Sequence, residues 1–201
     1  HLKSPSSAGL PPLTGGLVGF MGYDVVRRLE KLPSLSKKDL PLPELSFMLT
    51  SDLAVLDHSD GTITLIANAI NWDGSDDRID EAFNACNERL DRMQVDLAAP
   101  LDGEIAQIDS HASPTFDANM SPEDFKAKIA IAKEEILAGE AFQVVLSQRF
   151  DIDLTADPFD VYRVLRQVNP SPYMYFLRQP DLTIVGGSPE PLVQFPVFPG
   201  R

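Results

Sequence analysis

The sequence has few of the residues on which several common classes of protein depend. Its single cysteine, Cys86, cannot form an internal disulfide, and the amphipathic stretch around it favours a small buried hydrophobe over a nucleophile. There is no run of eighteen or more apolar residues, and no basic segment followed by an apolar one near the start. This pattern predicts neither a membrane span nor a signal peptide, and it indicates a cytoplasmic protein.

Basic residues are scarce as well. The 17 Lys and Arg residues are outnumbered by 30 Asp and Glu residues, which gives a formal net charge of −13. Proteins that bind nucleic acids gain much of their affinity from Lys and Arg facing phosphates, so this balance argues against a nucleic-acid partner. An anionic ligand would need a few placed cations, a metal ion, or residues outside these 201.

The apolar residues are sufficient for a folded core. They make up 43% of the 201 residues, enough for one large or two small domains. Between Arg92 and Lys126 the sequence has acidic residues but no basic one, and little periodicity, which predicts an acidic linker at 99–120. We therefore predict an N-terminal region at 1–98 and the beginning of a second domain at 121–201.

In 1–98, local patterns predict three strands and two helices. Asp60-Gly61 lies between two apolar runs, which is a hairpin signal, and apolar residues recur at helical spacing after residue 76. The expected elements are a glycine-flanked strand before residue 23, a short helix at 23–29, strands at 45–57 and 62–69, and a helix from 76 to about 95.

In 121–201, helix-capping residues predict two helices. Ser121 is the expected N-cap of the first, Pro122 follows in its first turn, and Gly139 is expected to end it. The expected remaining elements are a helix at 158–168 and strands at 141–150, 173–178, 182–186 and 192–195. This order is typical of mixed α/β or α+β domains.

Two polar residues of this region each have two interpretations. In the 141–150 strand, alternation sends Phe142 to one face and Gln143 to the other, so Gln143 either lines a pocket or is a satisfied polar residue of a half-buried strand. Glu190 ends the run Gly-Gly-Ser-Pro-Glu. It is either a site residue or an exposed glutamate in a turn.

The segment at 169–176 contains two prolines close together. Pro170 and Pro172 remove two backbone donors and hold their neighbours extended, so the segment is not expected to be an ordinary central strand. It is either an edge strand whose prolines discourage pairing, or a segment whose free backbone groups meet a ligand.

These segments, together with the run Gly-Gly-Leu-Val-Gly-Phe-Met-Gly-Tyr-Asp at 15–24, resemble the chorismate-utilising family. The resemblance is closest to the large, chorismate-binding subunit of anthranilate synthases (component I), and it spans nearly the whole chain. It implies an α/β (α+β) sandwich of antiparallel sheets flanked by helices. It also implies that 1–98 is incomplete at its start and 121–201 at its end, because the family's upstream Leu-Glu-Ser element and later histidine, arginine and glutamate elements do not occur.

The resemblance also implies catalytic roles. Family members that add water to chorismate have a lysine base where this sequence has Gln143, and an amide cannot accept the proton as that lysine does. Gln143 therefore favours ammonia, which needs no such base. Glu190 resembles the family's acid, which protonates the departing C4 hydroxyl from an enclosed site.

The segment at 169–174 resembles the family's site for tryptophan as feedback inhibitor, which implies contacts from Asn169, Pro172, Tyr173 and Met174. The implied reaction converts chorismate and ammonia to anthranilate and pyruvate in tryptophan biosynthesis. A glutamine amidotransferase subunit would supply the ammonia, and Mg2+ would be held by ligands outside this chain. The alternatives are an aminodeoxychorismate synthase component I, which generally differs at the Tyr-Met pair, or a non-catalytic fragment that retains part of the inhibitor or partner surface.

Overall fold

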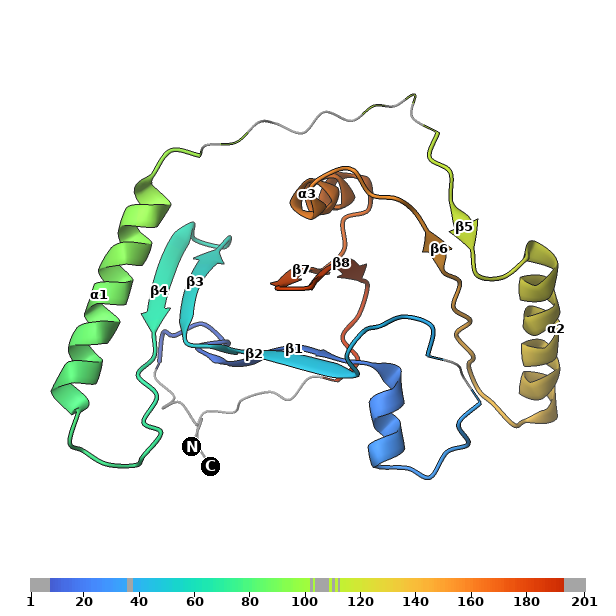
Figure 1. The fold of residues 1–201 in the computed structure, drawn as a ribbon, viewed down its shortest axis with the longest axis horizontal. Coiled ribbons are helices and arrows are strands. Elements are labelled where there is room, and N and C mark those ends of the chain that lie inside the picture. The colour runs from blue at the N-terminus through green and yellow to red at the C-terminus, as the bar shows by residue number, and fades with distance from the viewer. Residues whose placement is uncertain are drawn as a thin grey trace. The chain divides into compact units, whose positions relative to one another are not determined.

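The computed structural model describes residues 8–35, 38–101, 103, 109, 111 and 113–193. They fall into two compact units, one within His1–Gly103 together with Val193 and the other within Glu104–Leu192. In the described residues the strands form two-stranded antiparallel pairs (Figure 1). No helix of this described part is long and apolar enough to cross a membrane.

The first unit contains two strand pairs, a short 3-10 helix and one long helix. Along the chain they are β1 (Gly16–Met21), η1 (Tyr23–Arg28), β2 (Leu45–Thr50), β3 (Asp52–Asp57), β4 (Thr62–Ala67) and α1 (Ile79–Ala98). β1 pairs with β2, and β3 pairs with β4 in the expected hairpin, where the Gly61 N–H donates to the Asp57 carbonyl at 2.9 Å. The glycine-flanked strand, the hairpin and the long helix are thus confirmed.

The predicted strand at 45–57 differs from the structure. It is divided at Ser51 into two strands, because β2 and β3 hydrogen-bond to different partners. The predicted short helix after β1 is present, but as a 3-10 helix rather than an α-helix.

Asn68 connects the two strand pairs to α1. Its side-chain Nδ2 donates to the Thr14 carbonyl at 2.6 Å and to the Ser51 carbonyl at 2.9 Å. Its own carbonyl accepts from Arg89 Nη2 at 2.8 Å, and Arg89 Nε lies 3.0 Å from Asp52 Oδ1. One amide side chain therefore holds the start of β1 next to the division between β2 and β3, and one arginine ties both to α1.

Gly15 leaves the space that Asn68 occupies. A Cβ at Gly15 would lie 2.8 Å from Asn68 Nδ2 and 3.2 Å from the Thr50 carbonyl oxygen, and the residue has a φ of +153°. A side chain at this position would therefore clash and would also strain the backbone.

The second unit contains two helices and two strand pairs among its described residues. Along the chain its elements are β5 (Asp117–Ala118), α2 (Pro122–Ala138), β6 (Phe150–Asp151), α3 (Pro158–Val168), β7 (Tyr173–Gln179) and β8 (Leu182–Ser188). The predicted caps are confirmed: Ser121 Oγ accepts from the Asp124 N–H at 3.1 Å, and Gly139 ends α2 with a φ of 83°. Asp157 caps α3 by accepting from the Phe159 N–H at 2.7 Å.

The predicted strand at 141–150 is wrong over most of its length. Only Phe150 is in a strand, and β6 pairs with the two-residue β5, which itself lies inside the predicted 99–120 linker. A strand is stable only when its N–H and C=O groups bond to a neighbour, and residues 141–149 have no strand partner among the described residues. Phe142 is accordingly 99% exposed.

The last predicted strand, at 192–195, is also absent from the two of its residues that the structure describes. Leu192 and Val193 lie outside any strand, and residues 194–195 lie outside the described residues. Parts of the predicted linker, at 102, 104–108, 110 and 112, lie outside them as well.

Apolar packing is sparse within each unit. Cys86 is the only described residue that is buried, which confirms its expected place among core residues, and it is a free cysteine. In the second unit α3 packs on β7 and β8. Aromatic rings make its contact with β7: the Phe159 and Phe176 centroids are 5.2 Å apart, and those of Tyr162 and Phe176 are 5.9 Å apart.

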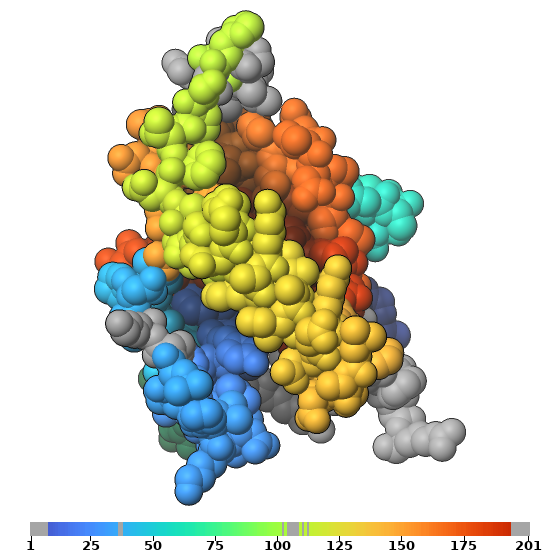
Figure 2. All heavy atoms as spheres, turned by 90° about the vertical axis from the view of Figure 1, so that its right-hand side faces the viewer, coloured from blue at the N-terminus to red at the C-terminus, as the bar shows by residue number. Residues whose placement is uncertain are grey.

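Helix α2 illustrates the exposed apolar surface. Figure 2 shows its atoms, in yellow, on the face turned toward the viewer. Phe125 and Ile129 on its predicted apolar stripe are half-buried, but Ile131 is 62% and Leu137 is 81% exposed. The described residues therefore leave apolar side chains of this helix in contact with water.

The role of Asn68 can be tested by replacing it with alanine. The half-buried Thr14 would lose the donor to its carbonyl, and the Ser51 carbonyl would keep only the N–H of residue 68, so the free energy of unfolding should fall by roughly 1–3 kcal/mol. Urea unfolding of the full-length protein measures the difference. Asn84→Ala is the matched control, because Asn84 is exposed on α1 and makes no side-chain hydrogen bond in the described structure. Equal midpoints for both variants would contradict the assignment.

Candidate functional site

The pairing of β7 with β8 brings two of the predicted site segments side by side. The antiparallel register runs from Tyr173 opposite Ser188 and Met174 opposite Gly187 to Gln179 opposite Leu182. The proline-rich segment at 169–174 therefore meets the end of the strand that leads to the Ser-Pro-Glu run. These segments lie twelve residues or more apart in sequence, and the hairpin makes them neighbours.

The ladder of hydrogen bonds between β7 and β8 stops where a proline occurs in each of the two segments. Tyr173 and Ser188 form its last pair, and the next residues are Pro172 and Pro189, neither of which has an N–H to donate. Side chains replace the missing backbone bonds. Ser171 Oγ donates to the Ser188 carbonyl, and Ser188 Oγ donates to the Glu190 carbonyl at 2.9 Å.

Glycine on β8 allows a close approach by side chains of the proline-rich segment. A Cβ at Gly187 would lie 2.8 Å from Met174 Sδ and 3.3 Å from Ser171 Cβ. The Met174 side chain therefore lies against the backbone of β8, and Ser171 lies close to the same position. A larger residue at 187 would displace both.

The predicted inhibitor contacts all lie at or just before the start of β7. Asn169 follows α3 as its C-cap, where its N–H donates to the Leu165 carbonyl at 2.9 Å. Pro172 is exposed, Tyr173 is 45% exposed and Met174 is half-buried. These residues thus form a continuous surface segment that ends α3 and begins β7.

The two predicted catalytic residues have different surroundings. Glu190 is exposed two residues after β8, and its position relative to β7 follows from the Ser188 contacts. Gln143 is exposed on the segment at 141–149, which pairs with no described strand. The structure thus connects Glu190 to the predicted inhibitor segment at 169–174, and among the described residues it records no contact that connects Gln143 to either.

The first unit has a hollow that the sequence patterns did not predict. It has a volume of about 600 Å3 and lies between the 68–78 segment and the first half of α1. Its walls include Ile70, Trp72, Ile79, Phe83 and Cys86. The turn-forming run Asn-Trp-Asp-Gly-Ser at 71–75 is the sequence signal that could have indicated a shaped loop here.

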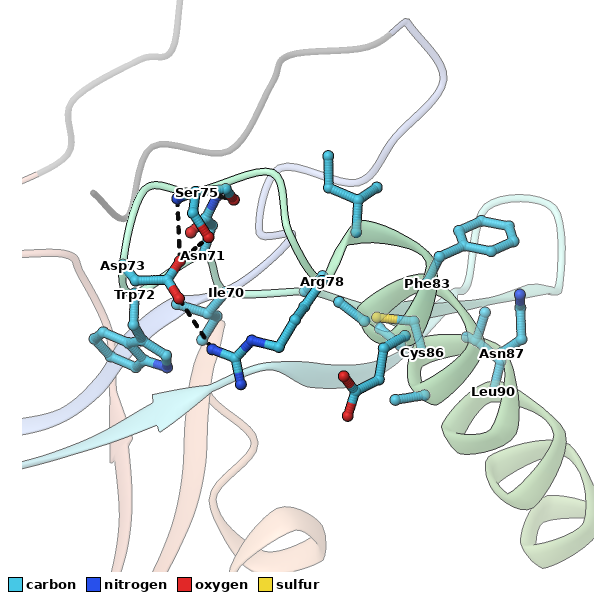
Figure 3. A pocket seen from close by; sticks show the side chains of 16 residues that line it. Ile70, Asn71, Trp72, Asp73, Ser75, Arg78, Phe83, Cys86, Asn87 and Leu90 are labelled. Carbon is cyan, nitrogen blue, oxygen red and sulfur yellow. Dashed lines mark hydrogen bonds and ion pairs between the residues drawn. The ribbon is translucent and has the colours of Figure 1, made fainter.

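Polar groups line one side of this hollow. Asp73 Oδ1 accepts from the Ser75 N–H, and Asp73 Oδ2 lies 3.0 Å from Arg78 Nη2 (Figure 3). The Ser75 backbone N–H, followed by the Arg78 side chain, lowers the pKa of Asp73 below its ordinary value. The ionised carboxylate therefore stabilises this loop at pH values above the ordinary pKa of an aspartate, and that contribution is lost as the pH falls through the lowered pKa.

The described residues do not form a metal site. Asp117, Asp151 and Asp153 line a second hollow of about 500 Å3 beside the β5–β6 pair. In the described part of the chain, however, no group of three or more His, Cys, Asp or Glu side chains is placed to hold a metal ion. We therefore assign none of these three carboxylates to a metal ion.

Two serines were missed by the sequence analysis. Ser171 and Ser188 each lie next to a proline in the motifs. The Ser171 hydroxyl bonds across to the Ser188 carbonyl, and the Ser188 hydroxyl bonds to the Glu190 carbonyl on its own segment. The Ser-Pro pairs themselves were visible in the sequence, but only the pairing of β7 with β8 brings the two serines close together.

Comparison with known proteins gives a consistent result. A family model described as chorismate binding enzyme matches residues 2–196. The anthranilate synthase component 1 of Mycolicibacterium smegmatis is 51% identical over 198 residues, which are 96% of this chain and 38% of that protein. The protein of the same name from Arthrobacter globiformis is 42% identical over 200 residues, again 96% and 38% of the two chains.

The fold agrees with these relatives. The crystal structure of anthranilate synthase component I from Streptococcus pneumoniae TIGR4 matches with a TM-score of 0.74 and 33% identity, over 94% of this chain and 41% of that one. The predicted combination of helices with antiparallel strands is confirmed for this part of the fold. The chain spans about 38% of the length of its first relatives. It belongs to the chorismate binding enzyme family, and the relatives that it matches are named anthranilate synthase component 1 or component I.

Proposed function

We propose that the protein containing these 201 residues converts chorismate and ammonia to anthranilate, pyruvate and water in tryptophan biosynthesis. The observation that carries this proposal is the 51% identity, over 96% of this chain, to a protein named anthranilate synthase component 1. Because the chain spans 38% of that relative, the activity is proposed for the whole protein. The 201 residues alone are proposed to be inactive.

Gln143 is proposed to lie near C2 of chorismate, where the nucleophile attacks. A carboxamide cannot remove a proton from water, whereas neutral ammonia carries its own lone pair and needs no base. The residue type at 143 therefore favours ammonia as the nucleophile. A glutamine amidotransferase subunit is the proposed source of that ammonia.

Glu190 is proposed as the general acid. The C–N bond forms at C2 while the C4–O bond breaks, and a proton from the Glu190 carboxyl lets the C4 hydroxyl leave as water. Elimination of the C3 side chain as pyruvate then gives the aromatic ring. Glu190 is exposed among the described residues, so its enclosure from water is proposed to come from other parts of the protein.

Mg2+ is proposed as a cofactor of the whole enzyme, with ligands outside this chain. The described residues do not fit a metal site, so none of them is given a role toward the ion. The cytoplasm is the proposed location, because chorismate-dependent synthesis of an amino acid is expected there and the sequence contains a single cysteine.

Tryptophan is proposed to inhibit the enzyme at 169–174. Two observations support this site: Tyr173 and Met174 occur as the pair typical of tryptophan-regulated members, and 169–172, which contain prolines at 170 and 172, lie outside the strand ladder that begins at Tyr173. The same pair supports anthranilate synthase over aminodeoxychorismate synthase component I. A product assay separates the two, because anthranilate and aminodeoxychorismate differ in absorbance and mass.

Turnover by the full-length protein tests the proposal directly. With chorismate, ammonium and Mg2+, the full-length protein should release anthranilate and pyruvate in equal amounts, measured by anthranilate fluorescence and a pyruvate assay. The isolated 201 residues should release neither. Formation of aminodeoxychorismate would instead identify the folate-pathway enzyme.

Replacement of Glu190 by glutamine removes the proposed acid while keeping its size. We expect kcat for ammonia-dependent anthranilate synthesis to fall by about 10²- to 10⁴-fold. Glu140→Gln is the control, since Glu140 is exposed beyond the end of α2. A Glu190→Gln enzyme with full kcat would remove Glu190 from the mechanism.

Replacement of Gln143 by lysine introduces a residue that can act as a base toward water. The ammonia-dependent rate should fall by about tenfold or more, because a lysine at 143 would occupy the place from which ammonia is proposed to attack C2 and would let activated water compete with it. Gln167→Lys, on the exposed face of α3, introduces the same charge elsewhere. An unchanged anthranilate rate in Gln143→Lys would count against a place for residue 143 near C2.

Replacement of Met174 by alanine tests the inhibitor segment. Loss of its apolar contact should raise the tryptophan concentration for half inhibition about tenfold, which corresponds to roughly 1.4 kcal/mol. Activity without tryptophan should stay the same. Met21→Ala, at a site 66% exposed in the other unit, is the control. Equal inhibition of the Met174→Ala and unmodified enzymes would remove Met174 from the site.

A further inference from the structure

We propose that the hydroxyls of Ser171 and Ser188 form a relay through which an amino acid bound at 169–174 changes the position of Glu190. The inference rests on the proposed function, because it assigns a route between the proposed inhibitor segment and the proposed acid. Ser188 is then a positioning residue for Glu190, and Ser171 is the residue that responds to the inhibitor.

The register of the hairpin places the relay. β7 and β8 are paired with Tyr173 opposite Ser188, so continuation of the same register would put Ser171 opposite Glu190. Regular pairing cannot continue, because Pro172 and Pro189 occupy the intervening positions and neither has an N–H. The connection between the two segments beyond the ladder is therefore left to side chains.

The two serines supply that connection in sequence. Ser171 Oγ donates to the Ser188 carbonyl, and Ser188 Oγ donates to the Glu190 carbonyl at 2.9 Å. Ser188 thus accepts a hydrogen bond from the inhibitor segment and donates one to the residue proposed as acid. Its position depends on both, and Pro189 limits the backbone conformations that the short link to Glu190 can adopt.

An amino-acid ligand offers a better acceptor for the first hydroxyl. Prolines at 170 and 172 remove two backbone donors, so the Ser171 hydroxyl is a principal donor of the segment. A carboxylate accepts a stronger hydrogen bond than a neutral carbonyl. A bound carboxylate would therefore take the Ser171 hydroxyl away from the Ser188 carbonyl. The relay then has two states, one with the Ser171–Ser188 bond and one without it.

The surrounding backbone allows such a change. Gly187 has no side chain, and Met174 Sδ and Ser171 Cβ lie close to where its Cβ would be, so displacement of either residue acts on β8 next to Ser188. Glu190 makes no side-chain hydrogen bond among the described residues that would hold it independently. When Ser188 moves, Glu190 therefore moves with it, because no second hydrogen bond in the described residues holds the Glu190 side chain in place.

The test uses the full-length enzyme and Ser188→Ala. Ser188 lies outside the inhibitor segment, so tryptophan should bind with an unchanged Kd in calorimetry. The kcat should fall about fivefold with KM unchanged, as expected for loss of one neutral hydrogen bond that positions the acid. The fractional inhibition at saturating tryptophan should also decrease, and Ser188→Thr, which keeps the hydroxyl, should restore both values.

Ser171→Ala tests the other end of the relay. Ser171→Ala lacks the Ser171–Ser188 bond with or without tryptophan, so its kcat without tryptophan should already be reduced toward that of the inhibited enzyme. Saturating tryptophan should then cause a smaller fractional inhibition than in the unmodified enzyme. The double variant should show no further loss of coupling, because both changes interrupt the same route. Ser113→Ala is the control, since Ser113 is an exposed serine of the same unit with no side-chain hydrogen bond in the described structure.

The outcomes separate the relay from the proposed function. Complete inhibition of Ser188→Ala and Ser171→Ala by tryptophan, with kcat unchanged, would overturn the relay alone. Failure of the unmodified enzyme to make anthranilate would overturn the proposed function and the relay with it. If Ser188→Ala does not fold, Ser171→Ala and Ser188→Thr still decide the question, because coupling must be lost in the first and kept in the second.

Discussion

In the unit within Glu104–Leu192, the antiparallel register of β7 and β8 decides which candidate residues can act on one another. Backbone hydrogen bonds hold Tyr173 opposite Ser188 and Met174 opposite Gly187. A shift by one residue would turn every side chain to the other face of the hairpin. The proposed inhibitor segment and the proposed acid are neighbours because of this register, and the prolines beyond it leave two serine hydroxyls to continue the connection.

In the other unit, a side chain has the corresponding role. Asn68 bonds to the carbonyls of Thr14 and Ser51 and accepts from Arg89, so it organises two strand pairs and a helix around one amide. Gly15 is required there because a Cβ would occupy the space of the amide. Both units thus depend on hydrogen bonds at the ends of strand pairs more than on a closed apolar core.

The exposure of apolar residues is consistent with the length of the relatives. Cys86 is the only buried residue among those described, and Phe142 and Leu137 are largely exposed. The chain spans about 38% of its first relatives, so most of their length has no counterpart in these residues. Gln143 and Glu190 are both exposed in the described residues.

The sequence was sufficient to predict those structural features that depend on interactions between residues close together in the chain. Ser121 with Pro122, Asp157 with Pro158, and Gly139 mark helix ends that the structure confirms, because each acts on backbone groups within a few residues. The Asp60-Gly61 hairpin is predictable for the same reason. The residues at 143, 173, 174 and 190 also identified the family, since residue type and order are properties of the sequence alone.

Pairing between distant segments was decided only in three dimensions. The run at 141–150 has the alternation of a strand, yet 141–149 pair with no described strand, because alternation does not supply a partner for the backbone. The run at 45–57 looks like one strand, but it serves two partners and divides at Ser51. The sequence by itself determined the helix ends, the hairpin turn and the family. Tertiary structure decided that Ser171 and Ser188 meet, because a hydrogen bond depends on distance in space.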